Sequence, residues 1–176
     1  LSAYEVINDY SKEALEEIFR EYGEIHESKK LASIICEARY SEPIKSAKEL
    51  SKLAEKIGGK KTIHPSTLLF QAIRIEVNNE LGVLNALLES IKNAKLQECR
   101  VAIISFHSLE DRIVKQTFKF WSQNCICPPE VMRCLCGNNH SMGKLLTKKP
   151  IEASNKELKK NPRSRSAKLR VFAIKA

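Results

Sequence analysis

The stretch VAIISFHSLEDRIVK, residues 101–115, is the feature that most limits how this chain folds. It opens with a short apolar, β-branched run without polar alternation, which predicts a strand buried on both faces of a parallel sheet. The spacing of Ser108 and Asp111 matches a capping box, and apolar residues recur at helical intervals from Leu109 to Trp121. We therefore predict a strand, a tight turn and a helix. In open α/β sheets such a turn lies at the edge where ligands bind.

Two interpretations of this polar turn are open from the local pattern alone. In the first, Ser108 and Asp111 only cap the helix, and His107 is a turn residue hydrogen-bonded to the backbone. In the second, the polar cluster is a functional site. A single strand–turn–helix unit is compatible with both, because a fold does not determine a function.

The first hundred residues predict helices separated by clear breaks. Ser2 and Ser46 each begin a capping-box pattern, and Pro65 is suited to the first turn of a later helix. That later segment carries a polar stripe with both hydrogen-bond donors and acceptors, formed by Gln71, Arg74, Asn78 and Asn79. The pattern as a whole predicts a small helical bundle.

The net charge of +9 is concentrated at one end of the chain. Residues 144–176 contain 11 Lys and Arg against 2 Asp and Glu, so the rest of the chain is neutral overall. A solvated tail is the usual meaning of such a run. Here, however, the charges continue into a predicted strand from Lys168 to Ile174, which follows the turn signal Asn161-Pro162. An ordered basic segment favours a polyanionic partner, most simply nucleic acid.

Four of the six cysteines lie in the turn-rich stretch NCICPPEVMRCLCGNNH as two Cys-x-Cys pairs, namely Cys125, Cys127, Cys134 and Cys136. Four thiols suit a tetrahedral zinc ion, although the usual spacing is Cys-x-x-Cys. The alternative is four reduced cysteines in a surface loop. The sequence shows no signal peptide and no apolar run long enough to span a membrane, which favours a cytoplasmic protein with reduced thiols.

Three long stretches carry a resemblance to a known family: IHPSTLLFQAIRIEVNNEL, ISFHSLEDRIVK and NPRSRSAKLRVFAI, in this order. Together they resemble the bacterial ribosomal RNA small-subunit methyltransferase H family, also called MraW, over essentially the whole chain. The resemblance implies an α/β enzyme in which a helical insertion interrupts a Rossmann-like domain that binds S-adenosylmethionine. Residues 1–62 correspond to the insertion, which is expected to recognise the substrate. Residues 63–176 correspond to the C-terminal half of the Rossmann-like methyltransferase domain.

The activity that the resemblance implies is methylation of the exocyclic amino nitrogen of a decoding-centre cytidine, in small-subunit ribosomal RNA or the assembled small subunit. That nitrogen is a weak nucleophile, so it must be oriented toward the methyl donor and must lose a proton. The candidate catalytic residues are Ser105, His107, Ser108 and Asp111. The candidate RNA-binding residues are Gln71, Arg74, Asn78, Asn79, Arg112, Arg163, Arg165, Lys168 and Arg170.

The family's glycine-rich cofactor loop precedes the helical insertion, and the six glycines of this chain do not have its spacing. We therefore expect this chain to correspond to the C-terminal portion of the enzyme, to contain no residue that binds S-adenosylmethionine and to be inactive alone. Two other function classes are an RNA-binding module without catalysis and a zinc-stabilised regulator that binds DNA. The second of these predicts one metal ion per chain.

Overall fold

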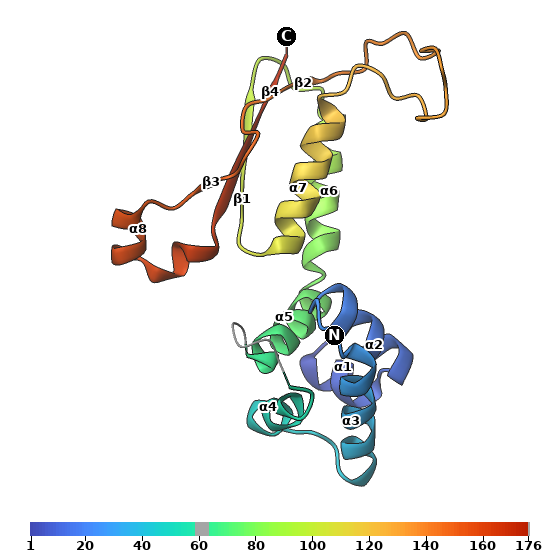
Figure 1. Cartoon of the computed structure of the whole chain (residues 1–176), viewed down its shortest axis with the longest axis vertical. Coiled ribbons are helices and arrows are strands. Elements are labelled where there is room, and N and C mark those ends of the chain that lie inside the picture. Colours follow the sequence, from blue (N-terminus) through green and yellow to red (C-terminus); the bar gives the residue numbers. More distant parts are fainter. Residues whose placement is uncertain (59–63, 176) are drawn as a thin grey trace. The chain divides into compact units, whose positions relative to one another are not determined.

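The computed structural model describes residues 1–58 and 64–175, which form two compact units, Leu1–Glu80 and Leu81–Ala176 (Figure 1). The sequence places the boundary after residue 62, which lies outside the described residues. Helix α5 (Pro65–Asn78) packs with the helices that precede it, because Leu69, Ala72 and Ile73 join their core. The first compact unit therefore extends to Glu80.

The first unit is helical. The helices that precede α5 are α1 (Ala3–Asp9), α2 (Lys12–Glu21), α3 (Ser28–Ser41) and α4 (Ala47–Glu55). Ser2 makes the expected capping box with Glu5. Ser46 accepts the N–H of Glu49 at 3.2 Å, but the Glu49 carboxylate accepts the N–H of Lys45 instead of completing a box. Each helix buries one apolar face, and the largest side chains with no exposure are Phe19, Leu15, Leu31, Ile35 and Leu69.

The second unit combines helices with a small antiparallel sheet. In chain order its elements are α6 (Glu80–Asn93), β1 (Arg100–Ser105), α7 (Ser108–Trp121), β2 (Gly143–Leu145), β3 (Ile151–Glu152), α8 (Asn155–Lys160), the 3-10 helix η1 (Pro162–Ser166) and β4 (Lys168–Ile174). The strand order is β1-β4-β2, and β3 also pairs with β4. This mixed architecture confirms the predicted α/β class.

An aromatic cluster holds α7 on this sheet. The rings of Phe118, Trp121 and Phe172 lie with their centroids 5.4–5.6 Å apart, and Leu88 of α6 and Val114 pack around them. Such ring pairs stabilise a core beyond the apolar area that they bury. The helical spacing from Leu109 to Trp121 therefore did identify the buried face of α7.

Gly143 lets the short strand β2 approach β4 closely. A Cβ atom at this position would overlap the carbonyl oxygen of Ala173. Gly143 pairs with Ile174 and Leu145 with Phe172, so this contact sets how β2 closes the sheet. The sequence predicted β1 and β4 but not β2 or β3, since strands of two or three residues carry too little pattern to recognise.

The prediction that β1 lies buried on both faces of a parallel sheet is wrong for this chain. β1 pairs antiparallel with β4, with Val101 opposite Phe172 and Ile103 opposite Arg170. Val101 and Ile103 pack against the aromatic cluster, whereas Ile104 lies on the other face and is 58% exposed. The apolar run therefore reflects two apolar faces, of which the described residues cover one.

Among residues 1–58 and 64–175, no helix is both long and apolar enough to cross a lipid bilayer.

Candidate functional site

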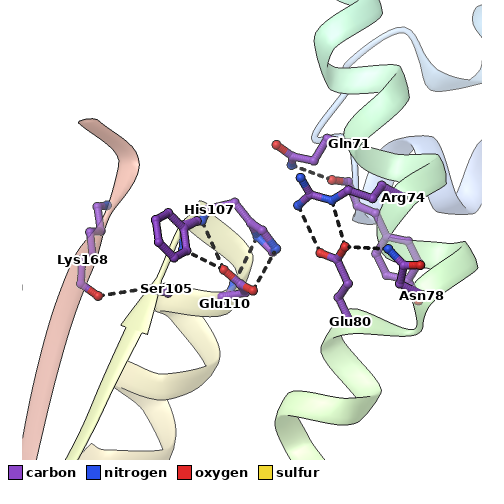
Figure 2. Close-up of polar contacts among 10 residues, drawn as sticks. Gln71, Arg74, Asn78, Glu80, Ser105, His107, Glu110 and Lys168 are labelled. Atoms are coloured by element: carbon purple, nitrogen blue, oxygen red, sulfur yellow. Dashed lines mark hydrogen bonds and ion pairs between the residues drawn. The ribbon is translucent and has the colours of Figure 1, made fainter. Parts of the chain in front are cut away.

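One end of the sheet in the second unit gathers most of the candidate catalytic residues. Ser105, the last residue of β1, pairs with Lys168, the first residue of β4. Because the two strands are antiparallel, the turn that contains His107 and the 3-10 helix η1 leave the sheet at the same end. Figure 2 shows Ser105, His107 and Lys168 around this end of the strands.

His107 is the N-cap of α7, and its partner is Glu110. The His107 Nδ1 atom accepts the N–H of Glu110 at 3.3 Å. The Glu110 carboxylate in turn accepts the N–H of His107 at 3.3 Å and that of Phe106 at 2.8 Å (Figure 2). The predicted capping box of Ser108 and Asp111 is therefore wrong by one residue. The box forms from His107 and Glu110, and Ser108 is the first residue of the helix and is exposed.

This geometry fixes the orientation of the His107 ring. Because Nδ1 accepts a backbone hydrogen bond, the neutral ring carries its proton on Nε2, which lies 3.5 Å from Glu110 Oε1. The side chain is only 7% exposed. Both ring nitrogens are thus directed at Glu110. This arrangement is better suited to positioning the turn than to accepting a proton directly.

Asp111 is engaged in a buried ion pair with Arg170. The guanidinium of Arg170 donates to the two carboxylate oxygens at 2.6 and 2.9 Å, and Lys168 Nζ lies 3.9 Å from the same carboxylate. Asp111 is 8% exposed and Arg170 is 4% exposed. The hydrogen bonds from Arg170, reinforced by its charge, lower the pKa of Asp111 below its ordinary value of 3.8.

This ion pair corrects two expectations from the sequence. Arg170 was expected to bind RNA, but its guanidinium lies in the interior because β4 turns that face toward α7. Asp111 was expected to take part in catalysis, but both of its oxygens bind Arg170, so its role in this structure is to join α7 to β4.

The other candidates near this end have more ordinary environments. Ser105 is 3% exposed, and its hydroxyl donates to the backbone oxygen of Lys168 at 3.3 Å, so it ties two strands together. Lys168 is half-buried, and Arg112 is exposed on α7. The structure therefore brings Ser105, His107, Asp111, Lys168 and Arg170 together, with His107 and Lys168 nearest to the end of the sheet.

The predicted polar stripe lies in the first unit, where its members have partners. Gln71 donates to the backbone oxygen of Tyr22 at 3.0 Å. Arg74 binds both carboxylate oxygens of Glu80 at 2.8 and 3.1 Å, and Asn78 donates to the same carboxylate at 3.2 Å (Figure 2). Asn79 ends α5 in the left-handed conformation, with φ of 50°. These contacts hold the end of α5, so the stripe has a structural role in addition to any role in binding.

Exposed basic side chains surround the start of β4. Arg163 and Arg165 are exposed on η1, on either side of Ser164, which is buried and donates to the Asn161 oxygen at 2.7 Å. The exposed lysines on the preceding helix α8 are Lys156, Lys159 and Lys160. The predicted basic segment is thus ordered and anchored, and it is not a free tail.

The four cysteines of the predicted metal site lie in the loop between α7 and β2, and their Sγ atoms all lie within 4.8 Å of one another. Hydrogen bonds from the N–H groups of Ile126 and Asn138 lower the pKa of Cys136 to about 5. The N–H of Cys127 acts in the same direction on Cys125, but hydrogen bonds with the neighbouring thiols outweigh it and raise the pKa of Cys125 to about 12. Backbone donors directed at Cys136 therefore stabilise its thiolate within this group of four neighbouring sulfurs.

Two residues near the turn between β1 and α7, Phe106 and Glu110, are not among the candidates predicted from the sequence. Glu110 orients His107, and the spacing of His107, two residues and a Glu was the available signal for it. Phe106 directly follows β1 and is 57% exposed. An exposed aromatic residue in an otherwise polar turn is a recognisable feature of nucleic-acid-binding surfaces, where rings stack on bases.

Comparison with known proteins gives a consistent result. The sequence model of the MraW methylase family matches residues 1–175. The chain is 61% identical over 176 residues to the ribosomal RNA small subunit methyltransferase H of Campylobacter curvus, which covers 99% of this chain and 57% of that protein. It is 59% identical to the protein of the same name from Aliarcobacter butzleri, over 98% of this chain and 56% of that protein. The chain thus spans a little over half the length of the curated relatives it matches.

Proposed function

Because this chain belongs to the MraW methylase family, we propose that the complete protein containing it methylates the exocyclic amino nitrogen of a cytidine in small-subunit ribosomal RNA, with S-adenosylmethionine as methyl donor. The observation that carries this proposal is the match of residues 1–175 to the family, supported by relatives that are named as small-subunit ribosomal RNA methyltransferases. The decoding centre is the proposed location of the cytidine.

The binding of S-adenosylmethionine is assigned to the part of the complete protein outside this chain. A nucleoside cradle needs glycines spaced so that the backbone can approach the ligand. Gly23 and Gly143 instead pack against backbone of this chain, and Gly58 and Gly137 are isolated turn residues with positive φ. These four glycines therefore do not fit the cofactor, and Gly82 lies within the helix α6.

Within this chain, the end of the sheet around His107 is the proposed place where the target cytidine is held. His107 is proposed as a positioning residue, since the capping box fixes the turn that carries Phe106 and Ser108. The exposed Arg163 and Arg165 lie at the same end of the sheet and are proposed to bind phosphates of the RNA. The helical segment 1–62 is proposed to recognise the surrounding substrate.

The proposal is tested by methyl transfer with the complete protein. The substrates are S-adenosylmethionine with a labelled methyl group and small subunits from cells that lack this enzyme. We expect label in N4-methylated cytidine after digestion of the RNA to nucleosides and mass spectrometry. RNA binding without label would favour the module without catalysis, and label in another nucleoside would contradict the proposed substrate.

Replacing both Arg163 and Arg165 with Ala is expected to weaken RNA binding and to make it less dependent on salt. Anchored arginines release counterions from the phosphates that they bind, and each phosphate on a single strand contributes a slope of about −0.7 in log affinity against log salt. The slope should therefore flatten by roughly 1 to 1.5 units in filter-binding titrations with a ribosomal RNA fragment.

The matched control for this pair removes two exposed lysines of the same unit, Lys92 at the end of α6 and Lys119 at the end of α7. This control changes the net charge equally and should leave the slope nearly unchanged. Equal flattening by both double variants would mean that overall charge, and no particular site on η1, governs binding.

A further inference from the structure

The loop between α7 and β2, residues 122–142, brings the Sγ atoms of its four cysteines within 4.8 Å of one another. The Sγ atoms of Cys125 and Cys134 lie 3.5 Å apart, those of Cys134 and Cys136 lie 3.5 Å apart, and those of Cys125 and Cys136 lie 3.7 Å apart. Four sulfurs at about 2.3 Å from a tetrahedral zinc ion must lie about 3.8 Å from one another. A disulfide would need about 2.05 Å, so the observed spacing fits a shared metal and does not fit a bonded pair.

Two backbone hydrogen bonds relate the two Cys-x-Cys pairs to each other. The N–H of Ile126, inside the first pair, donates to Cys136 Sγ of the second pair at 3.4 Å. The N–H of Leu135, inside the second pair, donates to Cys127 Sγ of the first pair at 3.3 Å. Donors aimed at sulfur stabilise thiolates, which are the form that binds metal, and such outer contacts orient the ligands. The reciprocal pattern explains how a spacing of one residue between cysteines can build a closed site.

Apart from a few hydrogen bonds, the loop has little regular structure and little core of its own. No helix or strand lies between Trp121 and Gly143, and apolar side chains such as Met132 and Leu135 are 100% and 83% exposed. The loop is tied at its base by the N–H of His140 to the Asn124 oxygen and by the N–H of Met142 to the Trp121 oxygen. Long loops without secondary structure or a core are uncommon in compact domains, and small coreless segments often depend on a metal.

We propose that Cys125, Cys127, Cys134 and Cys136 bind one zinc ion as a structural site. Four thiolates fill the tetrahedron and leave no position for water or substrate, which is the arrangement of structural rather than catalytic zinc. His140 is not needed as a ligand, since its Nε2 lies 2.7 Å from the Cys136 backbone oxygen. The ion orders the loop that projects from the second unit beyond the end of α7 (Figure 1).

The first test is metal analysis of the chain purified under reducing conditions without chelator. We expect one equivalent of zinc per chain and its loss in the Cys134→Ser variant. The matched control is Cys99→Ser, which removes a thiol of the same unit outside the cluster and should keep the zinc. Circular dichroism of both variants checks that the fold is intact, which is expected because Cys134 is exposed. Protein with no metal, or with stoichiometric iron, would overturn the proposal.

A second test uses the unsubstituted chain, so it does not depend on a variant that folds. After zinc is replaced by Co²⁺, we expect the visible bands of tetrahedral cobalt bound by four thiolates. Trypsin should cleave after the exposed Arg133 only once a chelator has removed the metal. An octahedral cobalt spectrum, or cleavage at Arg133 that is equally fast with and without chelator, would show that the thiols do not hold a structural ion.

Discussion

The Asp111→Ala variant is expected to lose about 3–5 kcal/mol of unfolding free energy, because it leaves Arg170 buried without its counter-charge. The Arg170 side chain is 4% exposed, and Asp111 accepts two of its hydrogen bonds. Arg170 Nη1 already has no hydrogen-bond partner among the described residues, so removing the Asp111 carboxylate would leave Nε and Nη2 of the guanidinium without these bonds as well. The measurement is denaturation followed by the fluorescence of Trp121, the single tryptophan, which lies in the core of the same unit.

Two further variants test whether the loss of unfolding free energy comes from the buried ion pair or from removing any charged residue. Replacing Asp111 with Leu and Arg170 with Met together should recover most of the stability, since apolar residues of similar size often replace a buried ion pair without loss. Glu89→Ala breaks an exposed pair with Lys92 on α6 and should cost at most about 1 kcal/mol. A cost for Asp111→Ala as small as that of Glu89→Ala would show that the Arg170 site is open to water.

The same pair predicts a dependence of stability on pH. Because the folded pKa of Asp111 lies below its ordinary value of 3.8, the folded state binds the proton less tightly than the unfolded state. The stabilisation is therefore complete above pH 3.8 and is lost as the pH falls through the lower folded pKa. The difference in stability between the unsubstituted chain and Asp111→Ala should be constant from neutral pH down to about 5 and should narrow below 3.8.

Local patterns predicted the elements around the site but not their connections. The strand, the turn and α7 follow from short-range spacing, so residues 101–121 could be predicted. The sequence could not show whether Ser108 or His107 caps α7, because each is followed three residues later by an acid. In the structure Asp111 binds Arg170 and does not cap the helix. Arg170 is distant in the sequence and is brought near by the pairing of β1 with β4.

Long-range contacts also account for the other differences. The sequence shows that Gln71 and Arg74 are polar, but not that Gln71 reaches the Tyr22 backbone or that Arg74 reaches Glu80. The spacing of the cysteines was unusual for zinc, whereas the folding of the loop brings the two pairs together through Ile126 and Leu135. In each case the unpredicted feature depends on a partner group outside the local pattern: a backbone group for Gln71 and the cysteines, and the Glu80 carboxylate for Arg74.

In the complete protein, the His107→Ala variant is expected to lower kcat for methyl transfer on the order of 100-fold, as is typical when a reacting group is displaced by about 1 Å. The reason is positional. His107 Nδ1 caps α7 at Glu110, and the Glu110 carboxylate holds the N–H groups of Phe106 and His107. Without the ring, the turn at the end of β1 loses this arrangement, while loss of the cap itself costs the fold only about 1 kcal/mol.

The His107→Asn variant distinguishes positioning from direct proton transfer. Asn is a good N-cap, so it should keep the turn, the thermal stability and most of the turnover, although it cannot accept a proton near neutral pH. The measurements are kcat, KM and their pH profiles on small subunits, with melting curves for His107→Ala and His107→Asn. A His107→Asn protein that is as stable as the unsubstituted one but as inactive as His107→Ala would show that the imidazole itself takes part in the chemistry. Positioning through the cap requires instead that turnover follow the stability of the turn in both variants.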